Sequence, residues 1–181
     1  MTLWLTRHAQ PLIAPGVCYG QLDVAASPQA SLACAEELVK ALPERIVIIT
    51  SPLQRCELLA LNLRALRPSF LLKTDPRLQE MNFGSWEDRP WADIDATELS
   101  AWTDNFAHYR AGSTGESVSQ FMARVADAYD ALDPATDTLW VTHAGVIRAA
   151  SLIAQGTRHI SQADAWPKQA PAYGQWCKLT V

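Results

Sequence analysis

Three short apolar runs in this chain end abruptly at polar residues that carry chemistry. Residues 3–5 lead into Arg7 and His8, residues 46–49 lead into Thr50 and Ser51, and residues 139–141 lead into Thr142 and His143. Runs of this length that alternate with helical patterns predict strands of a parallel sheet. The carboxyl ends of parallel strands meet at one edge of the sheet, which is where such folds bind their ligands.

The remaining pattern supplies helices and two further strands. Ser27 followed by Pro28 predicts a helix start, and apolar residues then recur at helical spacing as far as Leu42. Residues 70–73 predict another strand, and the alternating tail 173–181 predicts a final strand, for which an antiparallel place at the sheet edge is one option. We further expect helices over residues 53–66 and 146–155, and a long, mostly helical insertion over residues 91–132. The elements predict one α/β domain over residues 1–181 with a mostly parallel sheet.

Composition excludes several classes of function. The chain is 49% hydrophobic and 19% charged, with a formal net charge of −4. A mildly acidic protein lacks the basic surface that binding to nucleic acid or an anionic membrane requires. No basic and apolar leader precedes the first strand, and no apolar run reaches the length of a membrane span. We therefore expect a cytoplasmic protein.

The cysteine pattern points to thiols that serve in packing. Cys18, Cys34, Cys56 and Cys177 are scattered and show no C-x-x-C spacing. Reduced thiols are the expected state of such cysteines in a cytoplasmic protein, and neither disulfides nor a zinc site are expected.

The residues at the strand ends suit phosphate chemistry. A neutral imidazole such as His8 can attack phosphorus and split hydrolysis into two easier steps. Arg7 and Arg55 offer planar guanidinium groups for two-pronged phosphate contacts, and a protonated His143 would add another donor. No carboxylate cluster suited to magnesium is evident, so we expect a reaction without a metal or cofactor.

Taken singly, these residues have ordinary interpretations. An Arg-His pair is more often structural than catalytic, a histidine at a strand end is most often a hydrogen-bonded core residue, and an arginine on a helix is usually solvated. Their common placement after predicted parallel strands favours the catalytic interpretation.

Five segments in order resemble motifs of the histidine phosphatase superfamily, which includes the cofactor-dependent phosphoglycerate mutases. They are residues 6–9 (T-R-H-A), 51–55 (S-P-L-Q-R), 78–87 (L-Q-E-M-N-F-G-S-W-E), 115–117 (G-E-S) and 142–145 (T-H-A-G). The resemblance implies that His8 is the phosphorylated nucleophile and that Arg7, Arg55 and His143 bind phosphate. It also implies that Glu80 is the general acid and base, with catalytic roles for His8, Glu80 and His143.

The same resemblance implies the architecture: a three-layer fold with a mixed, mostly parallel sheet flanked by helices, and the helical insertion capping the site. Two positions depart from the family pattern. Ala9 replaces the usual glycine after the histidine, and Ala14 replaces a frequent asparagine. Gln10 or Gln21 are candidates to replace the missing phosphate donor.

Within this superfamily the residues of these motifs are most similar to those of alpha-ribazole phosphatases of cobalamin biosynthesis. The implied function is a metal-independent phosphomonoesterase that acts on alpha-ribazole 5′-phosphate. Trp86 and Trp91 follow Glu80 closely and are candidates for a wall that stacks on a flat base, with core packing as the alternative. Gln21 and Trp86 are therefore possible substrate contacts.

Other functions stay open at this stage. They are a broad-specificity small-molecule phosphatase, a phosphoglycerate mutase-like enzyme, and a catalytically weak phosphate-binding regulatory module. The last has no need of an acid such as Glu80. A homodimer is also possible. The expected partner is a small phosphomonoester, with no nucleic acid and no membrane.

Overall fold

The computed structural model describes all 181 residues and is built on one five-stranded sheet. The strand order is β4-β3-β6-β1-β7, and β7 alone runs antiparallel, against β1 at the edge. The predicted parallel strands and the antiparallel edge strand are therefore confirmed. The strands are β1 (Thr2–Arg7), β2 (Val17–Cys18), β3 (Val47–Thr50), β4 (Leu71–Thr74), β5 (Arg89–Pro90), β6 (Thr138–Thr142) and β7 (Trp176–Thr180).

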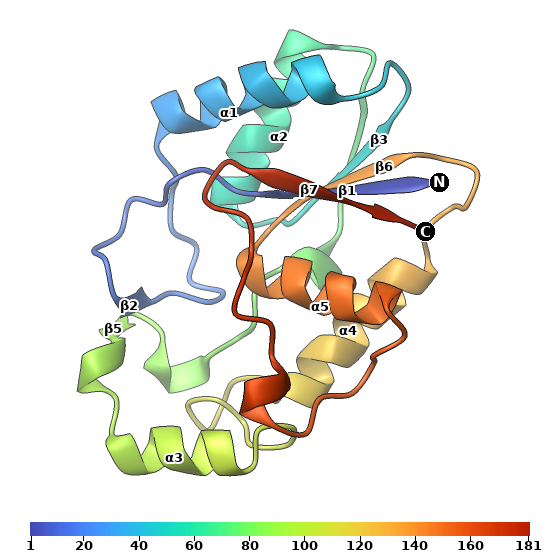
Figure 1. Ribbon diagram of the computed structural model, residues 1–181. Helices are drawn as coiled ribbons and strands as arrows, with labels where there is room; N and C mark the ends of the chain where they lie inside the picture. Colours follow the sequence, from blue (N-terminus) through green and yellow to red (C-terminus); the bar gives the residue numbers. More distant parts are fainter.

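Helices cover both faces of the sheet (Figure 1). They are α1 (Pro28–Ala41), α2 (Gln54–Leu66), α3 (Ala96–Asp104), α4 (Val118–Asp130) and α5 (Ala144–Ala154), with 3₁₀ turns at Pro76–Leu78, Gly84–Trp86, Trp91–Asp93 and Ala163–Ala165.

Alternating side chains of the strands divide the core into two clusters. In β1, Leu3 and Leu5 pack with α4 and α5, whereas Trp4 packs on the other face with α1 and α2. In β6, Trp140 belongs to the first cluster and Leu139 to the second. These two apolar faces produce the three layers that the family resemblance implied.

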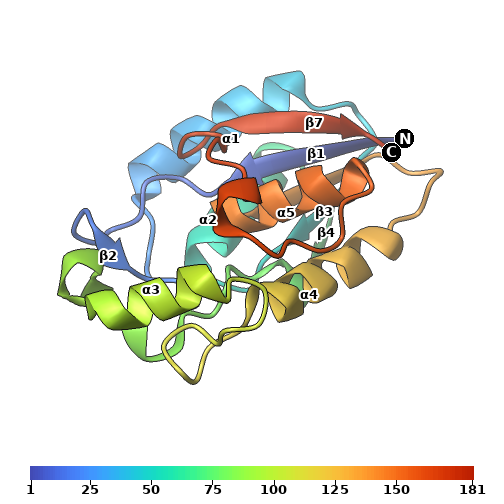
Figure 2. The ribbon, with the colours of Figure 1, turned by 60° about the horizontal axis from the view of Figure 1, so that its bottom comes forward.

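The 91–132 insertion is less uniform than expected. It divides into α3, a stretch of turns over residues 105–117, and α4. α4 packs along α5 as part of the main body, because its apolar face continues the core under the sheet. α3 instead lies with β2 and β5 beyond the sheet edge where β1 ends, as both ribbon views show (Figures 1 and 2). The cap is therefore α3 with its flanking turns rather than the whole insertion.

Helix starts follow local side-chain chemistry. Ser27 caps α1 by accepting a 3.2 Å hydrogen bond from the amide of Ala30, as Ser27-Pro28 predicted. Ser117 and Gln120 form a reciprocal capping box at the start of α4. α2 begins without a capping side chain of its own, and Asp23 of a distant loop accepts from the amide of Gln54.

All four cysteines are free thiols, and three of them are buried. None of the helices is both long and apolar enough to span a bilayer.

Candidate active site

The ends of three neighbouring strands bring the predicted site residues together. Arg7 at the end of β1 is paired in register with Thr142 at the end of β6. His8 and His143 follow directly, and their ring centroids lie 5.2 Å apart. Ser51, after the end of β3, lies 2.9 Å from Nε2 of His143. Because β3, β6 and β1 are neighbours in the sheet, residues from three distant segments of the sequence form one cluster.

His8 is held in one tautomer by its own backbone neighbour. Its Nδ1 lies 2.7 Å from the carbonyl oxygen of Ala9. A carbonyl can only accept, so Nδ1 must carry the proton and Nε2 presents a lone pair. His8 is 1% exposed. Burial, and then the neighbouring positive charge of Arg55, lower the pKa of His8 to about 3. The ring is therefore neutral at physiological pH.

His143 is fully buried beside His8. Burial, followed by the charge of Arg55, lowers the pKa of His143 well below its ordinary value. The ring is therefore neutral in the free protein, so the second donor that protonation would add is absent there. A neutral ring offers one N–H donor instead of two, and the Ser51 hydroxyl and the Cys56 thiol lie within reach of its nitrogens.

Arg55 is a fully buried cation without a carboxylate partner. It is 0% exposed, and its terminal nitrogens donate to the carbonyl oxygens of Gly20 (2.6 Å) and Leu22 (2.8 Å). Its Nε is buried and has no hydrogen-bond partner. A buried charge left unpaired is costly, and an anion bound beside it removes that cost.

Arg7 is a second guanidinium that has no carboxylate partner and whose buried Nε is without a hydrogen-bond partner. It donates to the carbonyl of Pro171 at 3.3 Å and stacks 3.8 Å from the ring centroid of Tyr173. Two guanidinium groups with free donors beside a neutral imidazole form a site suited to a phosphate dianion.

Two tyrosines cover His8. The ring of Tyr173 lies 5.5 Å from that of His8 and the ring of Tyr19 lies 6.4 Å from it. Their hydroxyl oxygens are 3.0 Å apart and hydrogen-bonded. Tyr19 comes from the loop between β2 and α1 and Tyr173 from the segment before β7, so two distant loops meet over the imidazole.

Glu80 has its carboxylate fixed by main-chain donors. Oε2 accepts from the amide of Gly145 at 3.0 Å, and Oε1 accepts from the amide of Met81 at 3.1 Å. Gly145 lies in the first turn of α5, so its N–H has no partner within the helix and is free to donate to Glu80. The acid that the resemblance implied therefore lies at the start of the helix that follows His143.

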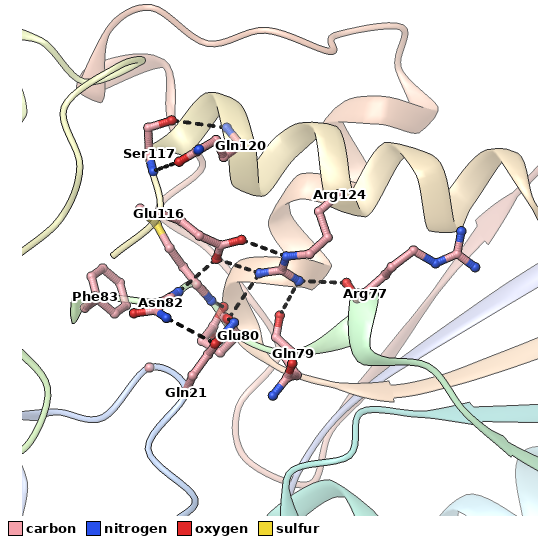
Figure 3. Close-up of polar contacts among 12 residues, drawn as sticks. Gln21, Arg77, Gln79, Glu80, Asn82, Phe83, Glu116, Ser117, Gln120 and Arg124 are labelled. Atoms are coloured by element: carbon pink, nitrogen blue, oxygen red, sulfur yellow. Dashed lines mark hydrogen bonds and ion pairs between the residues drawn. The ribbon is translucent and has the colours of Figure 1, made fainter. Parts of the chain in front are cut away.

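A polar network holds the main chain around Glu80 (Figure 3). Arg124 of α4 pairs with both carboxylate oxygens of Glu116, at 2.7 and 2.8 Å. The same guanidinium donates to the carbonyl oxygens of Arg77, Gln79 and Glu80. Glu116 also accepts from the amide of Asn82. Glu116 therefore joins α4 to the main chain that follows Glu80.

Two proposed substrate contacts are placed elsewhere. The side-chain nitrogen Nε2 of Gln21 donates to the carbonyl of Glu80 at 3.0 Å, and its side-chain oxygen Oε1 accepts from Nδ2 of Asn82. Gln21 therefore supports the acid segment rather than replacing a phosphate donor. Trp86 is 0% exposed and its indole N–H donates to Glu98 at 2.5 Å. The expectation of Trp86 as a stacking wall is wrong, because the ring is enclosed by other aromatic residues.

The two departures from the family pattern are accommodated. Ala9 is buried and does not adopt the left-handed conformation that would demand glycine. Ala14 and Gln10 are exposed. No group of three or more His, Cys, Asp and Glu side chains is arranged to hold a metal ion.

Sequence reasoning missed several residues of this region. Ser51 had a signal, since it lies inside the 51–55 motif. Arg148, which lines the same cavity as Glu80 and Gly145, also had one, since it lies one turn beyond Gly145 on α5. Tyr173 had none, because its segment carries no motif. His108 and His159 match none of the motifs and are exposed.

The comparisons with known proteins agree with this geometry. The model of the histidine phosphatase superfamily (branch 1) matches residues 3–179. A putative alpha-ribazole-5′-P phosphatase from Escherichia coli is 25% identical, with a TM-score of 0.81 over 98% of this chain and 89% of that one. A mycobacterial glucosyl-3-phosphoglycerate phosphatase is 26% identical, with a TM-score of 0.78 over 98% and 88%.

An alpha-ribazole phosphatase from Shigella flexneri, 24% identical over 100% of this chain and 91% of that one, shares the fold with a TM-score of 0.84. No curated protein matches the chain.

Proposed function

Because this chain belongs to the histidine phosphatase superfamily and is a phosphoric monoester hydrolase, we propose that it hydrolyses its substrate through a phosphate carried on Nε2 of His8. One observation carries the proposal. The buried, uncharged imidazole, with Nδ1 fixed by the Ala9 carbonyl, lies beside Arg55, a buried guanidinium without an anionic partner.

In the first step the Nε2 lone pair of His8 forms a bond to phosphorus, and the ester P–O bond breaks. A protonated Glu80 carboxyl gives its proton to the leaving oxygen, which departs as an alcohol. Arg7, Arg55 and the N–H of His143 hold the three other oxygens, whose charge must be stabilised throughout the transfer.

In the second step a water molecule attacks the phosphohistidine. The Glu80 carboxylate takes a proton from that water, a P–O bond forms, and the N–P bond breaks. Inorganic phosphate leaves, and His8 and the protonated Glu80 are restored. Nδ1 keeps its proton and donates it to the Ala9 carbonyl through both steps, so the same nitrogen, Nε2, attacks in every cycle.

For the physiological substrate we favour alpha-ribazole 5′-phosphate. The residues of the 78–87 motif around Glu80 and the similarity to a putative alpha-ribazole-5′-P phosphatase support this choice. Glucosyl-3-phosphoglycerate is the second candidate, because a phosphatase named for that ester is equally similar to this chain. The alternatives of a broad-specificity phosphatase and a mutase-like enzyme predict different reactions and are tested with it.

The test compares kcat/KM for alpha-ribazole 5′-phosphate, glucosyl-3-phosphoglycerate, 3-phosphoglycerate and fructose 2,6-bisphosphate, with EDTA present. We expect phosphate release from the ribazole ester to be the most efficient. Similar values for all four esters would indicate a broad-specificity phosphatase, and transfer between phosphoglycerates without release would indicate a mutase. No turnover of any ester would favour a phosphate-binding module and refute the proposed function.

A further inference from the structure

The peptide group between Gly20 and Gln21 lies between two opposite charges. Its carbonyl oxygen accepts a 2.6 Å hydrogen bond from a terminal nitrogen of Arg55, and its N–H donates at 2.9 Å to Oε1 of Glu87. The C=O and N–H of a trans peptide point in opposite directions, so the guanidinium and the carboxylate lie on opposite sides of one peptide plane. The two side chains form no ion pair with each other, and this peptide is the link between them.

The guanidinium of Arg55 depends on the 20–22 loop for its orientation. Its hydrogen bonds within the protein are those to the carbonyl oxygens of Gly20 and Leu22, and its Nε has no partner. Two acceptors on one planar fork fix the plane of the group. A displacement of the 20–22 loop would therefore change the direction in which the free donors of Arg55 meet a bound phosphate.

Glu87 fixes this loop against the 78–87 motif. Oε1 of Glu87 accepts from the main-chain amides of both Gln21 and Phe83, each at 2.9 Å. A β-carbon on Gly20 would overlap the same oxygen, so the loop packs directly on the carboxylate. Hydrogen bonds to an ionised acceptor are about twice as strong as neutral ones. Glu87 is therefore well suited to hold the loop in place.

The other polar contacts of the loop do not reach this peptide group. The side chain of Gln21 bonds to the carbonyl of Glu80 and to Asn82 (Figure 3). Asp23, which follows the loop, accepts from the amide of Gln54. The carboxylate of Glu87 is thus the group that holds the peptide whose oxygen contacts Arg55.

We propose that Glu87 is a positioning residue for Arg55, and that its carboxylate acts through the Gly20–Gln21 peptide to set the direction in which the buried guanidinium meets phosphate. This inference rests on the proposed function, since it concerns the phosphate site of the same reaction. The carboxylate also polarises the peptide, which strengthens the acceptor that faces Arg55. Because Glu87 acts through a peptide rather than in a direct ion pair, the guanidinium keeps its free donors for the substrate.

Binding of inorganic phosphate tests this link without any turnover. Glu87→Met removes the acceptor at a similar side-chain size, and the Kd of phosphate, measured by isothermal titration calorimetry, should rise about two- to tenfold. Glu87→Gln keeps an oxygen at the same position and should stay within about twofold of the wild type. Asp133→Leu is the matched control, because Asp133 also accepts from a main-chain amide, in the turn before β6 at the opposite end of the strands. Its Kd should equal that of the wild type.

A double variant separates positioning from a general loss of structure. The readout is kcat/KM for p-nitrophenyl phosphate, whose leaving oxygen needs no proton from Glu80. Glu87→Met should lower this value by about two- to tenfold in the wild type. In an Arg55→Lys background the same change should cost less than about twofold, because an ammonium offers no planar fork for the loop to orient. Equal losses in the two backgrounds would overturn the inference.

Unchanged phosphate affinity in folded Glu87→Met would also overturn it, as would equal weakening in Glu87→Met and Glu87→Gln. If Glu87→Met does not fold, Glu87→Asp takes its place, because it withdraws the carboxylate by one methylene and should cause the same loss of affinity. A wild type that neither binds phosphate nor hydrolyses p-nitrophenyl phosphate would instead refute the proposed function.

Discussion

The main-chain amide of Gly145 donates a 3.0 Å hydrogen bond to Oε2 of Glu80. A β-carbon at position 145 would overlap the Glu80 carboxylate, which is the far end of a flexible side chain. The first turn of α5 therefore defines the position of the proposed acid, and a residue larger than glycine displaces that acid without disturbing the main chain.

Gly145→Ala should lower kcat on alkyl phosphates by about 10²- to 10⁴-fold, the usual contribution of a general acid. Turnover of p-nitrophenyl phosphate should fall much less, because its leaving oxygen needs no proton. The thermal midpoint should stay close to that of the wild type. Glu80→Gln is the reference variant, and the double variant should lose no more than either single one. Additive losses would contradict this link.

Arg124→Met should reduce both stability and acid catalysis. It leaves three main-chain carbonyl oxygens and Glu116 without their shared donor. We expect a loss of about 1–3 kcal/mol in the free energy of unfolding, measured with urea. The ratio of alkyl to aryl phosphate turnover should also fall, and Arg124→Lys should restore part of it.

The matched control for Arg124→Met is Arg158→Met. This variant removes an exposed ion pair between Arg158 and Asp130, and Asp130 lies on α4, as Arg124 does. Neither stability nor the substrate ratio should change measurably in that variant. If Arg124→Met lowers stability and leaves the ratio unchanged, Arg124 is structural and does not position Glu80.

Sequence alone predicted the sheet, the edge strand and the meeting of His8, Arg55 and His143, because apolar runs with polar ends are a local signal of parallel strands. It did not predict the division of the 91–132 insertion. The apolar stripe of α4 shows that one face is buried, and nothing local says whether the cap or the main body covers it.

The aromatic residues illustrate the same limit. Trp86 is near Glu80 in sequence and lies in the core, whereas Trp102 and Trp166 reach the cavity beside Glu80 from two distant segments. The order of motifs identified the residues that carry charge. Which of the seven tryptophans lines that cavity depends on how the cap and the 163–166 turn pack together.

The buried histidines should make the fold sensitive to acid. The pKa of His8 is lowered to about 3, and that of His143 is also well below the value near 6.5 of an unfolded chain. At pH values between the folded and the unfolded pKa of each histidine, that histidine is protonated in the unfolded chain and neutral in the folded protein. The free energy of unfolding should therefore fall as pH drops below 6.5, by up to about 1.4 kcal/mol per pH unit for each histidine.

Urea unfolding at pH 7.5, 5.5 and 4.5 measures this dependence. His8→Gln removes one of the two groups, so its stability should fall less steeply than that of the wild type over the same range. Parallel curves for the two proteins would show that His8 titrates normally in the folded state.

Tyr173→Phe should make His8 more accessible. The variant removes the hydroxyl that is hydrogen-bonded to Tyr19 and keeps the ring against which Arg7 stacks. Diethyl pyrocarbonate should then modify His8 about two- to tenfold faster, as expected for the loss of one hydrogen bond. Peptide mass spectrometry measures the rate, with exposed His108 as the internal standard. An unchanged rate at His8 would show that the tyrosine pair does not control access.

The most direct test of the account is to trap the phosphorylated protein. Brief incubation with ³²P-labelled substrate, followed by denaturation without acid, should leave one label on His8 that is labile in acid and stable in alkali. His8→Ala should carry no label, and His108→Ala should carry as much as the wild type. Label on another residue, or rapid turnover in His8→Ala, would contradict the central role of His8.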